Sequence, residues 1–265
     1  PRNFSWAWVI CWRRLDNKKG NFTRLGKTKE ITGENLSPMF SGIIRHYDLI
    51  NHIFTWGMDK SWRKNLVAQC LRLKPEKVLD LGCGTGDLAI NIACLASENL
   101  HVTACDFSKE MLDVAAQKAR KVGVDNKISF INADAANFPF SDSYFDCVGI
   151  SFAFRNMIYK NAFADRHLAE ILRVLKPGGS CFIAETSQPR NKFIRALHHF
   201  YIRTYVYTIG LLISGDKKAY KYLTESAVNF YGPDKLGKIL ITAGFKQVFY
   251  QPLFFGAAGI YRLVK

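Results

Sequence analysis

Long apolar runs are absent from this chain of 265 residues, because no window approaches the about 18 uninterrupted apolar residues that a spanning helix requires. A membrane-spanning helix is therefore excluded. The cysteines contain no Cys-x-x-Cys pair and are scattered as Cys11, Cys70, Cys83, Cys94, Cys105, Cys147 and Cys181. This spacing argues against a disulfide framework and a structural zinc site, so we expect no metal and a reducing compartment. Internal repeats and low-complexity linkers are also missing.

Acidic side chains are the scarcer charge, since 37 Lys and Arg oppose 22 Asp and Glu and leave a formal net charge of +15. Residues 1–30 and residues 187–222 each carry a net charge of +6, whereas residues 77–186 carry −2. A nucleic-acid groove in the core would need basic residues there, so we expect no nucleic-acid partner. Basic flanks suit an anionic surface such as a membrane leaflet, although solubility and chance explain them about equally well.

Residues 1–30 join a short, Trp-rich apolar stretch to a basic run. This order is the reverse of a signal peptide, and the apolar stretch is too short to cross a bilayer. An interfacial anchor and a transit peptide both remain open. We expect residues 1–30 to form a basic extension, interfacial or disordered, and residues 31–265 to form a single domain.

From residue 77 onward, short apolar segments alternate with amphipathic ones. The predicted strands are residues 77–82, 100–106, 128–134, 145–152 and 180–187, and the predicted helices between them are 86–96, 109–122 and 160–175. This alternation predicts an α/β fold with a doubly wound, mostly parallel sheet. Residues 191–230 interrupt it as an aromatic-rich helical cap. A helix at 233–244 and a C-terminal hairpin follow, which brings the sheet to seven strands.

The segment LDLGCGTGD, residues 79–87, is the sharpest local signal. Gly82, Gly84 and Gly86 follow a predicted strand and open a predicted helix, so bare backbone can approach a ligand closely. A dinucleotide site would need a third glycine where this chain has Asp87. Because an acid at a helix start repels phosphate, the loop with its preceding Asp80 favours a ligand with a cationic or zwitterionic head.

Two further acids end predicted strands at the same edge of the sheet. Asp106 is positioned to accept hydrogen bonds from ribose hydroxyls, with Phe107 beside it. Asp134 is positioned to accept from an adenine amino group, and the Ala135 N–H faces the ring edge. A glycine loop with two strand-end acids suits an adenosine that carries a cationic amino-acid group, which describes S-adenosyl-L-methionine.

Several longer segments are typical of one enzyme family. They are YDLINHIFTWGMDKSW (47–62), NADAANFPFSDSYFD (132–146), ISFAFRN (150–156), RVLKPGGSCFIAETS (173–187) and AYKYLTES (219–226). From about residue 40 onward, the chain resembles the ubiquinone/menaquinone biosynthesis C-methyltransferases of the UbiE/MenG type. The resemblance implies a class I, Rossmann-like methyltransferase fold. It also implies that S-adenosylmethionine contacts Thr85, Asp106, Asp134, Ala135 and Ser151.

The reaction implied by this resemblance moves a methyl group to a ring carbon of a reduced, polyprenylated quinone. The expected conversion is demethylmenaquinol to menaquinol, or methylation of a 2-polyprenyl-6-methoxy-1,4-benzoquinol, and another small lipophilic acceptor is the alternative. Ionising a phenol with a pKa of about 10 at pH 7 costs about 4 kcal/mol. We expect Arg155 to stabilise the phenolate and Asn156 to orient the ring.

The proton acceptor stays open at this stage. Its candidates are His46, Asp48, Asp59, Tyr222 and a water held by Arg155. The resemblance also implies a cytoplasmic protein, peripheral on the inner membrane face, or a matrix protein if the source is eukaryotic. A homo-oligomer is one option for its assembly.

Overall fold

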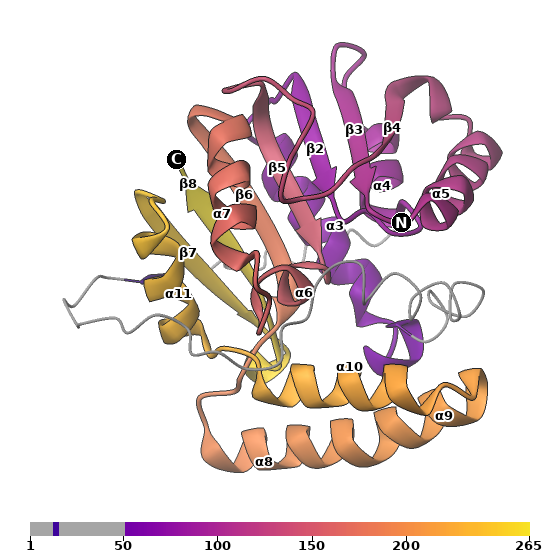
Figure 1. The fold of residues 1–265 in the computed structure, drawn as a ribbon, viewed down its shortest axis with the longest axis vertical. Helices are drawn as coiled ribbons and strands as arrows, with labels where there is room; N and C mark the ends of the chain where they lie inside the picture. The colour runs from indigo at the N-terminus through magenta and orange to yellow at the C-terminus, as the bar shows by residue number, and fades with distance from the viewer. Residues whose placement is uncertain (1–12, 16–50) are drawn as a thin grey trace, which may run out of the picture.

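The computed structural model describes residues 13–15 and 51–265, and one eight-stranded sheet runs through this part of the chain (Figure 1). The strands are β1 (Arg13–Arg14), β2 (Lys77–Leu81), β3 (His101–Asp106), β4 (Ile128–Asn132), β5 (Phe145–Ser151), β6 (Leu175–Thr186), β7 (Gln247–Leu253) and β8 (Ala258–Val264). They lie in the order β1-β7-β8-β6-β5-β2-β3-β4. The run from β4 to β6 is parallel, and β7 and β8 add an antiparallel hairpin. The predicted doubly wound, mostly parallel α/β sheet is confirmed.

Helices cover both faces of the sheet. They are α3 (Met58–Leu71), α4 (Asp87–Leu95), α5 (Lys109–Val122), α6 (Phe154–Ile158), α7 (Ala164–Val174) and α11 (Pro233–Thr242). Successive strand residues enter different cores, as alternation along a strand requires. In β2, Val78 belongs to the core that α3, α4 and α5 share, whereas Leu79 belongs to the core that α6, α7 and α11 share. Both side chains are fully buried, which explains the continuous apolar run that predicted this strand.

Helix α5 shows how closely local chemistry sets an element's ends. The Ser108 hydroxyl accepts a hydrogen bond from the Met111 N–H at 3.3 Å, which satisfies one donor of the first turn. Gly123 ends the helix in the left-handed region with φ 78°. The predicted helix 109–122 is confirmed at both ends.

Residues 191–230 form a helical cap at one end of the molecule, as predicted. The cap consists of α8 (Lys192–Tyr201), a π-helical turn η2 (Ile202–Val206), α9 (Tyr207–Ser214) and α10 (Lys217–Asn229). In Figure 1, α10 lies between the sheet and the layer made by α8 and α9. The Tyr220 ring of α10 packs so closely on α9 that a Cβ at Gly210 would lie 2.0 Å from it. Glycine is therefore required where these two helices meet.

Strand β1 corrects the expected number of strands. Arg13 and Arg14 pair antiparallel with Tyr250 and Phe249 of β7, and the Leu15 N–H donates to the Val248 carbonyl at 3.0 Å. Seven strands were predicted because two arginines carry no β-strand pattern of their own. The other residues of the predicted extension 1–30 lie outside the described part of the chain.

Replacing Leu79 by alanine tests the central position of β2. Because its side chain is completely buried between the sheet and the helices, we expect Leu79→Ala to lower the free energy of unfolding by about 2–5 kcal/mol. Leu95→Ala is the control, since Leu95 is exposed on α4 and its loss should change stability by less than about 0.5 kcal/mol. Urea unfolding followed by circular dichroism measures the free energy of unfolding of both variants. Equal effects of the two substitutions would contradict the assigned packing.

Candidate active site

The glycine loop crosses the carboxyl ends of β2 and β3. The N–H groups of Gly82 and Cys83 both donate to the Cys105 carbonyl, at 2.8 and 3.1 Å. Gly82 has φ +65°, and a Cβ there would lie 2.6 Å from the Cβ of Ala153, which follows β5. The loop therefore needs glycine to fit between neighbouring strand ends, and its backbone lines two small cavities.

Asp106 connects the glycine loop to helix α5. Its carboxylate accepts hydrogen bonds from the Gly84 N–H at 2.7 Å and from the Ser108 N–H at 2.9 Å. Burial raises the pKa of this carboxyl group, although the backbone hydrogen bonds oppose the rise. Asp106 thus helps to hold the start of α5, even though Ser108 supplies the side-chain cap.

A cavity of about 160 Å³ opens beside Asp106. Phe107, Met111, Asp134 and Ala135 line it, together with the backbone of the glycine loop. Asp134 follows the end of β4, and one of its oxygens accepts from the Ala136 N–H at 2.8 Å. The cavity thus places two carboxylates and an aromatic ring along one concave surface.

Asp80 is the most unusual ionisable group near the loop. It is completely buried, and burial raises the pKa of its carboxyl group to about 7. One carboxylate oxygen accepts from the Ala89 N–H at 2.8 Å, while the other has no hydrogen-bond partner among the described residues. Asp80 lines a small cavity of about 30 Å³ together with Thr85 and Ser151. A buried acceptor without a donor suits a cationic ligand group.

Arg63 of α3 lines the same small cavity from the other side. Its guanidinium pairs with the buried Asp59 and lies 3.3 Å from Asp87, which in turn pairs with Lys118. The cavity is therefore lined by one cation, Arg63, and two acids, Asp80 and Asp87. Such an arrangement suits a ligand that carries both an ammonium and a carboxylate.

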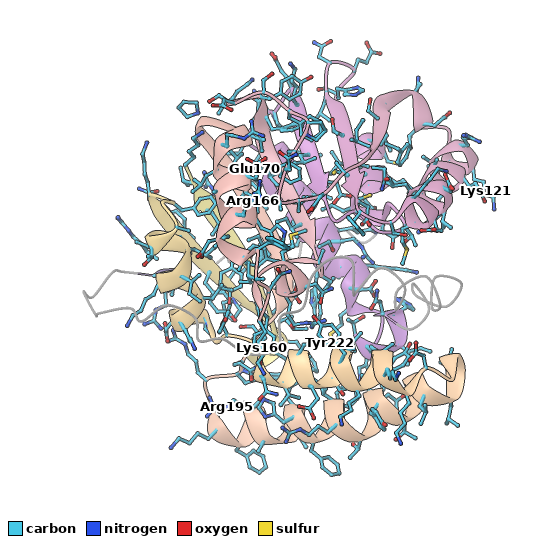
Figure 2. The ribbon with its side chains drawn as sticks, viewed as in Figure 1. Lys121, Lys160, Arg166, Glu170, Arg195 and Tyr222 are labelled. Carbon is cyan, nitrogen blue, oxygen red and sulfur yellow. The ribbon has the colours of Figure 1, made fainter. Side chains whose placement is uncertain are left out.

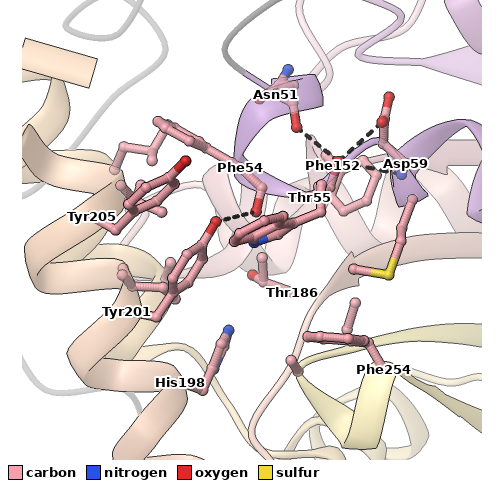
Figure 3. Close-up of a pocket in the computed structure, with 18 of the residues that line it drawn as sticks. Asn51, Phe54, Thr55, Asp59, Phe152, Thr186, His198, Tyr201, Tyr205 and Phe254 are labelled. Atoms are coloured by element: carbon pink, nitrogen blue, oxygen red, sulfur yellow. Dashed lines mark hydrogen bonds between the residues drawn. The ribbon is translucent and has the colours of Figure 1, made fainter. Parts of the chain in front are cut away.

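A much larger, mainly apolar cavity of about 860 Å³ lies between the sheet edge and the cap. Figure 3 shows aromatic side chains of the cap and of residues 51–56 around it, with Tyr201 donating to the Phe54 carbonyl. The cavity adjoins both smaller ones, because Asn156 also lines the 160 Å³ cavity and Phe152 also lines the 30 Å³ cavity. A lipophilic molecule in it would therefore lie against a ligand of the glycine loop.

Arg155 provides a buried cation on the wall of the large cavity. Its backbone N–H donates to Glu185 at 2.9 Å, and Nη1 donates to the Thr186 hydroxyl at 3.2 Å. Nη1 also lies 3.8 Å from the other Glu185 oxygen, while Nε has no partner among the described residues. The guanidinium is thus held in place and retains a donor for an incoming oxygen.

Asn156 connects the sheet edge to the cap. Its side-chain oxygen accepts a hydrogen bond from the Tyr222 hydroxyl at 3.3 Å. In Figure 2, Tyr222 lies on the side of α10 that faces the sheet. The pair closes one side of the large cavity.

The structure brings nearly all sequence-predicted site residues to these cavities. Asp80, Gly82, Gly84, Thr85, Asp106, Phe107, Asp134, Ala135 and Ser151 line the smaller ones, and Arg155 and Asn156 line the largest. Gly86 differs, because it lines none of the three and precedes α4 as its N-terminal cap residue. Sequence reasoning assigned no role to Arg63, Glu185 or His198. Within residues 13–15 and 51–265, no cluster of His, Cys, Asp and Glu is arranged to hold a metal ion.

The candidate proton acceptors differ in basicity. Burial raises the pKa of Asp59, but hydrogen bonding from His52 and the charge of Arg63 outweigh it and lower that pKa overall. Burial raises the pKa of Tyr222, which keeps its phenol protonated. His198 also lines the large cavity, and burial with the nearby His199 lowers its pKa to about 4. None of these three is a strong base at neutral pH, and His46 and Asp48 lie outside the described residues.

Comparison with known proteins places the sequence in one family. Residues 27–265 match the ubiE/COQ5 methyltransferase family. A demethylmenaquinone methyltransferase of Thermotoga maritima is 41% identical over 89% of this chain and 96% of its own length. A ubiquinone/menaquinone biosynthesis C-methyltransferase UbiE of Geotalea daltonii is 34% identical over 86% of this chain and 95% of its own.

Solved structures support the same fold at lower sequence identity. An S-adenosylmethionine-dependent methyltransferase from Aquifex aeolicus matches with a TM-score of 0.51 and 19% identity, over 71% of this chain and 81% of its own. An O-methyltransferase structure from Nostoc punctiforme gives a TM-score of 0.59 at 17% identity, over 87% of this chain and 70% of its own. The chain therefore belongs to the ubiE/COQ5 methyltransferase family and is an S-adenosylmethionine-dependent methyltransferase.

Proposed function

We propose that the protein methylates a ring carbon of a polyprenylated quinol, either demethylmenaquinol or a 2-polyprenyl-6-methoxy-1,4-benzoquinol. The relatives named above act on such quinones according to their names. The observation that carries the proposal is the 860 Å³ apolar cavity, which adjoins the glycine-loop cavities and holds Arg155 on its wall. An aromatic ring with an ionisable hydroxyl and a long apolar tail matches these features.

The residues around the two small cavities fit S-adenosylmethionine. The unpartnered oxygen of Asp80 suits the ammonium group, and the guanidinium of Arg63 suits the carboxylate. Asp106 suits the ribose hydroxyls, while Asp134 and Ala135 suit the adenine edge. When bound, the cofactor supplies an electrophilic methyl group on a sulfonium. Asn156, which lines cavities on both sides, aligns the two reactants.

Arg155 lowers the cost of ionising the quinol. The free Nε donor and the positive charge stabilise a phenolate oxygen inside an apolar cavity, where electrostatic interactions are stronger than in water. Glu185 and Thr186 hold the guanidinium in this position. Since Asp59 is already ionised and paired, and Tyr222 and His198 are weak bases, we assign the released proton to a water molecule beside Arg155.

We also propose that the enzyme works as a peripheral protein at a membrane surface, because a polyprenyl tail keeps its substrate there. No helix in the described part of the chain is long and apolar enough to cross a bilayer. Access to the substrate then requires a surface that binds the membrane from outside.

Truncated cofactors distinguish the roles of Arg63 and Asp80. We expect Arg63→Gln to weaken binding of S-adenosylmethionine by about 10–100-fold, as a charged hydrogen-bonded contact is worth about 1.5–3 kcal/mol, and to leave decarboxylated S-adenosylmethionine unaffected. Asp80→Asn should weaken binding of both S-adenosylmethionine and decarboxylated S-adenosylmethionine, because both carry the amino group. Neither substitution should alter binding of 5′-methylthioadenosine, which lacks the amino-acid portion.

Isothermal titration calorimetry measures these affinities, with Arg72→Gln on the exposed end of α3 as the matched control. A uniform loss of affinity for all three ligands in Arg63→Gln would mean that Arg63 only supports the fold of the site.

Asp80 should release a proton when the cofactor binds. At pH 6 its carboxyl group is mostly protonated, because its pKa of about 7 lies above the pH. A ligand ammonium beside it stabilises the carboxylate and lowers this pKa, so binding of S-adenosylhomocysteine should release up to about one proton at pH 6 and much less at pH 8. Calorimetry in buffers of different ionisation enthalpy counts the protons. Asp80→Asn should abolish the difference between the two pH values, and its persistence would assign the proton to another group.

Arg155→Ala tests the chemistry. The purified protein should convert a demethylated quinol into a product heavier by one methyl group, detected by mass spectrometry. We expect Arg155→Ala to lower kcat by at least about 100-fold while binding of S-adenosylmethionine stays unchanged, because the charge acts on the substrate oxygen. The control is Arg166→Ala, whose side chain is exposed on α7 (Figure 2). Unaltered turnover in Arg155→Ala would remove Arg155 from the mechanism.

A further inference from the structure

Exposed apolar side chains surround the mouth of the large cavity. We call these residues the apolar rim, and they are Trp56, Leu197, Phe200, Tyr205, Phe254 and Phe255. Each lines the 860 Å³ cavity and is also exposed, up to 76% for Phe255. The cavity therefore opens onto an apolar surface. Contiguous exposed apolar surface of this kind marks an interaction site in proteins.

The apolar surface continues beyond the rim along the outer layer of the cap. Phe193 of α8 and Leu212 of α9 are 78% and 80% exposed and do not line the cavity. Figure 2 shows rings below α8 that point away from the sheet. These side chains neither pack in the core nor shape the cavity, so their exposure indicates contact with something outside the chain.

The cap that carries this surface has more basic than acidic residues. Residues 187–222 carry seven basic side chains and one acidic side chain. The exposed basic residues of this segment are Arg190, which pairs with Asp234, and Lys192, Arg203, Lys217, Lys218 and Lys221. The acidic residue, Asp216, accepts a hydrogen bond from the Ala219 N–H at 2.9 Å and caps α10. The surface therefore complements an anionic partner.

Trp, Tyr and Phe side chains mixed with Lys and Arg are the composition that enters the interface of an anionic bilayer. A second copy of the chain is a poorer match, because the same basic surface would face itself and repel. The position of the cavity mouth adds a separate argument, since a tail that lies among lipids can enter the cavity directly only if the mouth faces them.

We propose that the apolar rim, the outer face of α8 and α9 and the surrounding basic residues form a docking surface for an anionic lipid bilayer. In this orientation the mouth of the large cavity faces the acyl chains, and the sheet with its cofactor cavities stays on the aqueous side. The proposal rests on the proposed function for the reason that the substrate resides in the membrane. It adds which face binds and which lipid charge is required.

Vesicle sedimentation of the whole 265-residue chain tests this surface. We expect binding to phosphatidylcholine vesicles that contain about one third phosphatidylglycerol, and at least about tenfold weaker binding to phosphatidylcholine alone. Phe193→Ser combined with Leu212→Ser should reduce binding to the anionic vesicles by at least about tenfold. Lys217→Glu combined with Lys218→Glu should do the same, and acids at the start of α10 are compatible with its helix dipole.

Matched controls lie on the opposite end of the molecule. Leu95→Ser with Val122→Ser removes two comparably exposed apolar side chains from α4 and α5. Arg120→Glu with Lys121→Glu reverses two exposed charges on α5, where Figure 2 shows Lys121 far from the cap. Neither control should change vesicle binding. Thermal unfolding of every variant verifies that the fold is intact.

Turnover on two substrates separates this proposal from the proposed function. The Phe193/Leu212 variant should methylate a short-tailed, water-dispersed quinol at the wild-type rate but act more slowly on a long-tailed quinol in anionic vesicles. If the protein did not bind vesicles but still methylated the short-tailed quinol, the proposed docking surface alone would be overturned. If the protein bound anionic vesicles normally but methylated neither quinol, the proposed function alone would be overturned.

Three further results would contradict the docking surface. Equal binding to neutral and anionic vesicles would overturn the assigned charge requirement, and unchanged binding of both cap variants would overturn the assigned face. If light scattering showed self-association that Phe193→Ser with Leu212→Ser abolishes while vesicle binding persists, the surface would be an interface between copies of the chain, contrary to the proposal.

Discussion

The hydrogen bonds that the Asp106 carboxylate receives from Gly84 and Ser108 hold the site together, because they join the glycine loop after β2 to the helix after β3. Both smaller cavities are lined by this loop. Its path is further restricted where Gly82 passes Ala153, which belongs to the segment after β5. The Asp106 carboxylate and the close approach of Gly82 to Ala153 thereby fix the relative positions of the segments that follow β2, β3 and β5. These segments meet because parallel strands end at the same edge of the sheet.

Charge is arranged differently in the two halves of the site. Around the glycine loop, the two acids Asp80 and Asp87 share a small cavity with the cation Arg63, and the burial of Asp80 favours its neutral form until a cation arrives. In the large cavity, Arg155 pairs with Glu185 on the wall, and the Arg155 Nε has no hydrogen-bond partner among the described residues. The first arrangement suits a zwitterion and the second suits a developing anion, so the two reactants differ in the electrostatics of their binding surfaces.

Much of the fold could be predicted from local patterns. The fully buried strands read as short apolar runs, and Ser108 and Gly123 marked both ends of α5. The glycine loop and the strand-end acids were found for the same reason, since their residue types are required at those positions. The predicted cofactor contacts remain predictions, although the residues line neighbouring cavities.

Other features had no local signal. Arg63 is one of three basic residues on α3, and only the fold shows that it is the one that reaches Asp87. Strand β1 depends on a pairing between Arg13–Arg14 and residues of the C-terminal hairpin. The sequence left open whether the aromatic residues of segment 191–230 pack in the core or hold a lipid tail, because periodicity alone does not reveal which helical faces find a partner.

The contact between Tyr222 and Asn156 has a consequence for the order of events. Any outward movement of α10 must break this hydrogen bond, and Asn156 also lines the cavity beside Asp106. A displacement of α10 that widens the large cavity would therefore also disturb a residue that lines the cavity beside Asp106. This one hydrogen bond therefore couples the position of the cap to the shape of the cavity beside Asp106.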